Sequence, residues 1–388
     1  MFRPAILAAL TFGLAALTVR AHPVPDIPVR AWFEPGGGAV IRVEVDPRCF
    51  EEDPEKTPYF LNAVLTDMTP KARDGMKAQA REFIRKSVEF RFEPLGRSDP
   101  EFEFNFTTHA GAPLTKLDDP VMITGEWRTR LPQGLEGYRI KALSAGSLSV
   151  LFINHVGGKA LERISVLFPG ETSFLLDLTR LTANAPTQPT PGSVGPDSTA
   201  GGRWATFVGF LREGFVHVVP KGLDHILFVL GLFLLAREWR PVLWQVTMFT
   251  LAHTLTLGLA TLKVVSVSPA VVEPVIAGSI AVVALENIFR PKYTHWRLAV
   301  VFVFGLVHGL GFAGALAALE LPRASLVVGL LGFNVGVEFG QLAVITLAFA
   351  ATVWLKDAAR YRNWVVVPGS ALIALMGVWW MVERIVTR

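Results

Sequence analysis

The sequence predicts a mainly β, β-sandwich-like exported domain followed by an all-α transmembrane bundle of about six spans. Three features predict this: an export signal at the start, short alternating segments after it, and long apolar stretches in the second half. Of the 388 residues, 51% are hydrophobic and 18% are charged, against roughly 25% charged in soluble domains. This composition excludes a disordered chain and a purely soluble enzyme.

The first residues have the form of a secretory signal peptide. Arg3 precedes an uncharged apolar run from Ala5 to Val19, and Val19-Arg20-Ala21 offers small residues at the two positions that a signal peptidase reads. We therefore predict that residues 1–21 are removed, in a protein of the bacterial inner membrane.

Residues 22–182 are expected to form the exported domain. Its candidate strands, in which apolar and polar residues alternate or short apolar runs stand between turn residues, are 39–45, 88–92, 102–106, 121–130, 148–154, 163–168 and 173–177. A helix is predicted around Pro70–Lys86. Strands at this spacing favour a β-sandwich. The only cysteine, Cys49, excludes an internal disulfide and a cysteine metal cluster.

Residues 183–202 are rich in Pro, Thr, Ser and Gly and contain almost no apolar side chains, which is typical of a linker. Residues 203–388 then form the predicted membrane domain. Its apolar stretches, long enough or nearly long enough to cross a bilayer, lie near 222–236, 241–262, 270–289, 297–318, 324–354 and 364–382. An amphipathic segment, 204–219, precedes the first of them.

The charges of the loops predict the orientation of this domain. Alternate loops are basic and carry Arg237, Arg240, Arg290, Lys292, Arg297, Lys356, Arg360 and Arg362, whereas the other loops hold only Lys263 and Arg323. Basic loops face the cytoplasm, and this agrees with an exported β domain on the periplasmic side. The net charge of +4 therefore reflects topology and not nucleic-acid binding.

Polar side chains in the apolar stretches mark a candidate site, because ionisable groups inside a membrane are costly and usually functional. The candidate metal ligands are His217, Asp224, His225, His253, Glu286, His308 and Glu338. The residues expected to line a pathway are Thr250, Asn287, Asn334 and Gln341.

We expect these side chains to be spread across the membrane. Asp224 and His225 should lie near the outer end of the first span, His253 and His308 near mid-membrane, and Glu286 in the inner half. Pro220 and Gly222 should break the helix beside them.

Imidazoles beside carboxylates suit nickel, cobalt, copper or zinc, whereas magnesium and calcium prefer oxygen ligands. The predicted cargo is a divalent transition-metal ion, with no tightly bound cofactor. Helix packing is the alternative reading of some of these positions, since Gly305, Gly309 and Ala313 form a row of small residues beside His308.

Five motifs in this half resemble the HupE/UreJ family. They are Gly222-Leu-Asp-His-Ile-Leu-Phe228 with His217 before it, Phe249-Thr-Leu-Ala-His-Thr-Leu-Thr-Leu257, Ala284-Leu-Glu-Asn287, the segment from Phe304 to Ala313, and Phe333-Asn-Val-Gly-Val-Glu-Phe-Gly-Gln341. The resemblance implies a nickel or cobalt permease, or an accessory of nickel-enzyme maturation with partners in that process.

Three functions remain open at this point. A permease is favoured, and a zinc-dependent intramembrane hydrolase or a non-transporting membrane scaffold are the alternatives. The sequence has neither a GxxxxGK[ST] loop for ATP nor an HExxH zinc-protease motif.

Overall fold

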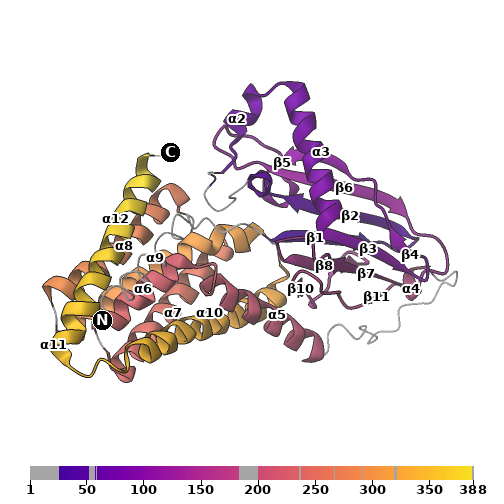
Figure 1. The fold of residues 1–388 in the computed structure, drawn as a ribbon. Coiled ribbons are helices and arrows are strands. Elements are labelled where there is room, and N and C mark those ends of the chain that lie inside the picture. The colour runs from indigo at the N-terminus through magenta and orange to yellow at the C-terminus, as the bar shows by residue number, and fades with distance from the viewer. Residues whose placement is uncertain are drawn as a thin grey trace.

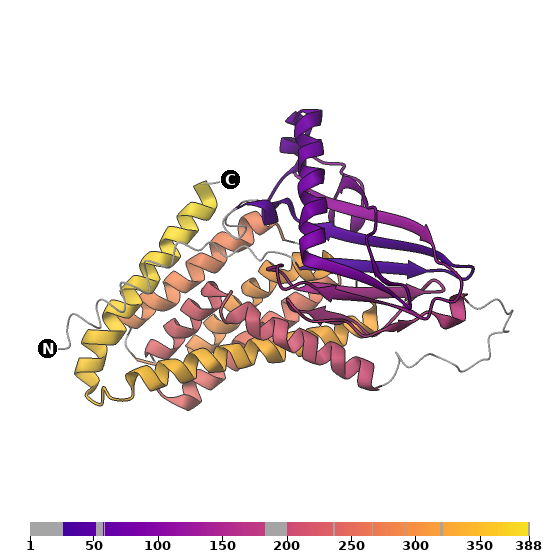
Figure 2. The same cartoon turned by 45° about the vertical axis from the view of Figure 1, so that its right-hand side comes forward.

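A computed structural model of the chain has a β domain at one end of a helical bundle (Figures 1 and 2). The described residues are 26–51, 57, 59–182, 200–235, 237–265, 267–290, 292–318 and 321–386. The predicted signal peptide and residues 183–199 of the predicted linker lie outside these ranges.

The β domain contains two sheets. Its strands are β1 (Ile27–Phe33), β2 (Gly38–Val45), β3 (Val88–Glu93), β4 (Gly96–Ser98), β5 (Glu103–Thr107), β6 (Met122–Arg130), β7 (Gly137–Ala142), β8 (Val150–Val156), β9 (Lys159–Ala160), β10 (Ser165–Leu167) and β11 (Leu176–Asp177). The larger sheet has the order β10-β8-β1-β2-β6-β5, with β9 paired to β8, and the smaller has the order β11-β7-β3-β4. All pairs are antiparallel except β1 with β8.

The two sheets share one apolar core. The ring centroid of Tyr138 of β7 lies 5.0–5.4 Å from those of Phe33, Phe92 and Phe152, which come from both sheets. The strand predicted at 88–92 is confirmed as β3, and its burial alternates residue by residue. Strand β1 was missed because six of its seven residues are buried, so it shows no alternation.

Short helices complete this domain. They are α2 (Asn62–Asp67), α3 (Pro70–Ser87), α4 (Thr179–Thr182) and the 3-10 turns Pro47–Phe50 and His109–Gly111. The helix predicted at Pro70–Lys86 is confirmed as α3. It begins where Thr69 caps the amide of Ala72 and Pro70 occupies the first turn.

The second half of the chain is helical. Its helices are α5 (Ala200–Val218), α6 (Leu223–Leu235), α7 (Trp239–Thr261), α8 (Pro269–Phe289), α9 (Trp296–Ala318), α10 (Arg323–Thr352), α11 (Ala358–Tyr361) and α12 (Val367–Val386), with a π-helical turn at Arg362–Val366 between the last two. The first three residues of α5 fall within the predicted linker.

Four of these helical segments are long and apolar enough to span a membrane, and they are Trp239–Thr261, Val271–Phe289, Arg323–Thr352 and Ala358–Val386. Helices α5 and α6 meet the same test together as a pair bent by 71°. The described apolar part of α9, Trp296–Gly311, is shorter. The predicted first span, 222–236, is thus only the second arm of a bent pair, and its amphipathic lead-in is a helix of 19 residues.

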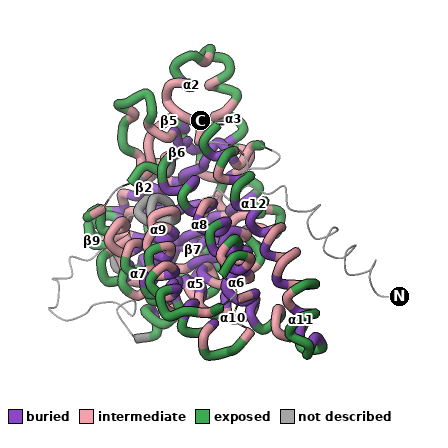
Figure 3. The backbone as a smooth tube through the Cα atoms, turned by 90° about the vertical axis from the view of Figure 1, so that its left-hand side faces the viewer, coloured by how far each residue is buried: buried purple, intermediate pink, exposed green. Residues whose placement is uncertain are grey.

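The outer surface of the bundle is apolar. Leu251, Leu255, Leu347, Leu375 and Trp379 are each more than half exposed, and Figure 3 shows exposed stretches along α7, α10 and α12. The tryptophans at the ends of helices and in the loops are exposed too, namely Trp239, Trp244, Trp296, Trp354 and Trp364. Such a surface suits lipid, with aromatic rings near the headgroups.

The β domain contacts the bundle along α5, which lies between the larger sheet and α10 (Figure 1). Leu151, Ile153 and Val166 of the sheet share a buried cluster with Phe210 of α5 and Phe333 of α10.

Polar contacts surround this cluster. The hydroxyl of Thr206 accepts from the Ile164 amide at 3.1 Å, and the Ser149 hydroxyl donates to Glu213 Oε1 at 2.5 Å. The β domain is therefore packed directly onto the helix that leads to His217.

Candidate metal centre

Three histidines from three helices converge inside the bundle. His217 lies in the last turn of α5, His225 in the first turn of α6 and His253 within α7. One ring nitrogen of each lies within 4.8 Å of the others. Nitrogens that hold one metal at 2.0–2.1 Å in tetrahedral geometry lie about 3.4 Å apart, so the rings would move closer together to bind an ion.

A fourth histidine borders the group. The ring centroid of His308 on α9 lies 5.6 Å from that of His225, and His225 lies 4.9 Å from His217 and 5.9 Å from His253. We call these four residues the histidine cluster. His225 is its centre, because its ring contacts the other three.

The break between α5 and α6 brings His217 and His225 together. The chain turns by 71° there, and Pro220, which has no amide hydrogen, lies within the break as predicted. A Cβ on Gly222 would lie 2.2 Å from the carbonyl oxygen of His217. Only glycine therefore permits this close turn.

Hydrogen bonds determine which nitrogen of His253 carries its hydrogen. The Asn334 amide nitrogen donates to the Leu330 carbonyl at 2.8 Å, so its Oδ1 is the atom 3.2 Å from His253 Nδ1. This oxygen can only accept, so Nδ1 carries the hydrogen and Nε2 keeps a lone pair.

The same argument holds for His308. Its Nδ1 lies 2.8 Å from the carbonyl oxygen of Phe304, which again can only accept. In both rings the Nε2 atom is the one available to a cation.

Three ring nitrogens of the cluster are buried without a partner. The Nε2 atoms of His225, His253 and His308 have no hydrogen-bond partner among the described residues. A buried polar atom without a partner is costly and needs an explanation. A bound cation would satisfy the lone pairs of His253 and His308.

Aromatic rings surround the cluster. Phe249 lies 4.9 Å from His308 and 5.9 Å from His225, Phe228 lies 5.2 Å from His308, and Phe333 lies 5.2 Å from His217. Phe228, Phe249 and Phe333 are almost fully buried. Apolar walls of this kind strengthen the attraction between a cation and its ligands.

The prediction that the ligands are spread across the membrane needs correction. We expected Asp224 and His225 near the outer end of the first span, apart from His253 and His308. The structure places His225 beside both. The reason is that α5 forms the first arm of the span, so the break falls inside the bundle.

Two of the predicted acidic ligands form ion pairs with arginines. Asp224 Oδ2 accepts from Arg384 of α12 at 3.0 Å, and Glu286 Oε2 accepts from Arg297 of α9 at 3.1 Å. Neither acid joins the three-histidine group in the described part of the chain.

The remaining polar side chains predicted from the motifs mostly line the contact between α7 and α10. Besides His253–Asn334, the Thr250 hydroxyl donates to Gln341 Oε1 at 3.1 Å and the Thr247 hydroxyl donates to Glu338 Oε1 at 2.9 Å. Gln341 Nε2 and Glu338 Oε2 have no partner among the described residues. A row of polar groups thus runs along these two helices from the histidine cluster.

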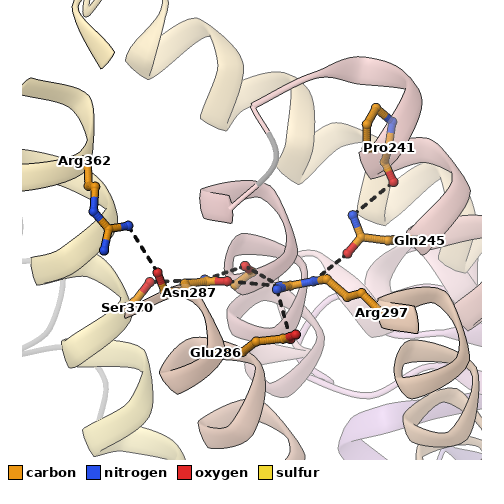
Figure 4. A network of polar contacts seen from close by, with 8 residues as sticks. Pro241, Gln245, Glu286, Asn287, Arg297, Arg362 and Ser370 are labelled. Atoms are coloured by element: carbon orange, nitrogen blue, oxygen red, sulfur yellow. Dashed lines mark hydrogen bonds and ion pairs between the residues drawn. The ribbon is translucent and has the colours of Figure 1, made fainter. Parts of the chain in front are cut away.

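Asn287 belongs to a separate network around Arg297 (Figure 4). Arg297 is 1% exposed and donates to Gln245 Oε1 at 2.8 Å and to Asn287 Oδ1 at 3.1 Å. The Asn287 amide donates in turn to the Gly231 carbonyl at 2.8 Å.

This network joins α6, α7, α8 and α9. Arg297 was predicted as one of the basic loop residues, but it is the second residue of α9. Its neighbours in the sequence contain no signal of its burial.

The row of small residues beside His308 does serve close packing. A Cβ on Gly305 or Gly309 would lie 2.6 Å from the Phe249 carbonyl or 2.2 Å from the Thr256 hydroxyl. Close packing and the histidine cluster therefore coexist, since these glycines bring α9 against α7.

Comparison with known proteins agrees with the motifs. Residues 197–384 match the family described as HupE / UreJ protein. No match was found among curated proteins or among solved structures. The match spans α5 to α12, including the histidine cluster, and the helical half of this chain belongs to the HupE/UreJ family.

Proposed function

We propose that this protein is a membrane permease for a divalent transition-metal ion, with nickel or cobalt as the preferred cargo. The observation that carries the proposal is the histidine cluster, in which one ring nitrogen each of His217, His225 and His253 lies within 4.8 Å of the others. Imidazole nitrogens favour later transition metals over magnesium and calcium. The HupE/UreJ family, related to nickel and cobalt, supports the same class of ion.

The arrangement suggests a role for each group. His217, His225 and His253 would hold the ion, with His308 beside them, and Asn334 would orient His253. Gln341 and Glu338 would then offer oxygen atoms along α7 and α10. The ion is cargo on this proposal, and no tightly held cofactor is involved.

The proposed direction is inward across the bacterial inner membrane. The basic loops would face the cytoplasm and the β domain the periplasm. Without an ATP-binding loop in the sequence, the driving force would be the membrane potential, a proton gradient or a partner ATPase. A metalloenzyme maturation system is the proposed consumer of the ion.

Uptake of radioactive Ni²⁺ into proteoliposomes tests the proposal. We expect His225→Ala to lower uptake at least tenfold, because His225 contacts all three other rings. His295→Ala is the matched control, since His295 is exposed and lies outside the cluster. Competition with Co²⁺, Zn²⁺ and Mg²⁺ then ranks the ions.

The alternatives give different results. A zinc hydrolase would retain one tightly bound zinc and take up no Ni²⁺. A scaffold would show no uptake that depends on His225 or His253. Either result would reject the permease.

A further inference from the structure

Arg384 is a buried cation that pairs with Asp224, the residue before His225. It lies near the end of α12, is 6% exposed, and donates from Nη2 to Asp224 Oδ2 at 3.0 Å. Its Nη1 donates to the carbonyl oxygen of Glu273 on α8 at 2.9 Å. One guanidinium therefore joins α12 to α6 and α8.

The carboxylate of Asp224 is only partly satisfied by this pair. Asp224 is 8% exposed, and its second oxygen, Oδ1, has no hydrogen-bond partner among the described residues. Asp224 directly precedes His225, the centre of the cluster.

We propose that Arg384 competes with the metal ion for the carboxylate of Asp224. This inference rests on the proposed function, because it concerns the same ion. Without the ion, the guanidinium balances the charge of Asp224 in a site made otherwise of neutral rings. A divalent cation among the imidazoles repels Arg384 and attracts Asp224, so the carboxylate exchanges one cation for the other.

The competition has two consequences. It lowers the affinity for the metal ion. A transport site needs a moderate affinity because it must also release the ion. It also links occupancy to helix packing, since the exchange removes the contact that joins α12 to α6. Arg384 is thus a positioning residue that lowers affinity, in contrast to a residue that only stabilises the fold.

Calorimetric titration of the purified full chain with Ni²⁺ tests this proposal. Arg384→Gln should bind Ni²⁺ at least tenfold more tightly than the wild type, because Asp224 loses its competitor. Arg384→Lys keeps the positive charge and should stay within about threefold of the wild type. The unfolding temperature of Arg384→Gln should be lower without Ni²⁺ and should rise more than that of the wild type on saturation.

A second comparison serves if Arg384→Gln does not fold. Asp224→Asn leaves the guanidinium near the site, whereas Asp224→Asn/Arg384→Gln removes both charges. The double variant should bind Ni²⁺ several-fold more tightly than Asp224→Asn. The two variants differ only in the positive charge of Arg384, which repels the ion.

The results separate this inference from the proposed function. If the wild type binds Ni²⁺ and Arg384→Gln binds it equally or more weakly, the proposed competition by Arg384 is wrong. The proposed permease function is then unaffected. Equal affinities of Asp224→Asn and the double variant would also reject it. A wild type that binds no divalent transition metal rejects both.

Discussion

The orientation of single side chains decides what the histidine cluster can bind. Asn334 is itself held by the Leu330 carbonyl, and this leaves only its oxygen for His253. Partners of this kind commonly change metal affinity 10–100-fold when they are removed.

We therefore predict that Asn334→Ala weakens Ni²⁺ binding about 10–100-fold, because the ring of His253 loses its fixed tautomer. Asn334→Asp keeps an acceptor at this position and should retain affinity or increase it. Titration of the purified protein measures both variants. Equal affinities of the alanine and aspartate variants would show that Asn334 does not orient the ring.

At the scale of elements, the cluster depends on glycines where helices cross. A Cβ on Gly336 of α10 would lie 2.0 Å from the Leu211 carbonyl of α5, and one on Gly214 would lie 1.9 Å from the Phe333 carbonyl. Helix α5 carries His217 and α10 carries Asn334. The distance between these two helices therefore sets the position of two parts of the site.

We predict that Gly336→Ala forces α5 and α10 apart. Overpacking of this kind costs about 1–3 kcal/mol, and Ni²⁺ binding should weaken with it because His217 moves away from His253. Gly258→Ala is the matched control, since its Cβ would meet only Leu330 Cδ1 at 3.9 Å. Thermal unfolding in detergent and Ni²⁺ titration measure the two effects, and a Gly336→Ala protein identical to the control would contradict the prediction.

At the scale of the whole molecule, the β domain and the bundle meet at a contact that contains carboxylates. Partial burial raises the pKa of Asp26 well above its usual 3.8, the nearby Glu213 carboxylate raises it further, and Lys221 opposes the shift. The folded chain therefore holds a proton on Asp26 at pH values where the unfolded chain has lost it.

The sign of the pH dependence follows from this shift. Below about pH 4 Asp26 is protonated in both states, and as pH rises toward its raised pKa the unfolded state is increasingly favoured. We predict that Asp26→Asn raises the unfolding temperature at pH 7 and has little effect near pH 4. Asp118→Asn, at an exposed position, is the control. A gain that is the same at both pH values would rule out titration of Asp26.

The orientation of the whole molecule has its own test, because Cys49 is the only cysteine. Burial, with a smaller contribution from the Asp46 carboxylate, raises the pKa of its thiol to about 12, so it stays protonated and unreactive at pH 7. We predict that an impermeant maleimide labels Val264→Cys in intact cells and labels Lys356→Cys only after permeabilisation. Both positions are exposed, and the reverse pattern would invert the proposed topology.

By itself the sequence determined the division into a β domain and an apolar helical half, the α3 helix and the residue types of the site. These follow from periodicity, composition and motifs, which are local properties of the chain. It also indicated the break at Pro220 and Gly222, since proline and glycine act through their own backbone.

Only the tertiary structure decided which of these residues meet. The bend between α5 and α6 places His225 beside His253 and His308. Arg384 pairs with Asp224, and Arg297 pairs with Glu286, each from another helix. The partner of a buried charge depends on how helices pack, and the Asp224–Arg384 pair joins residues 160 positions apart. No local pattern carries that information.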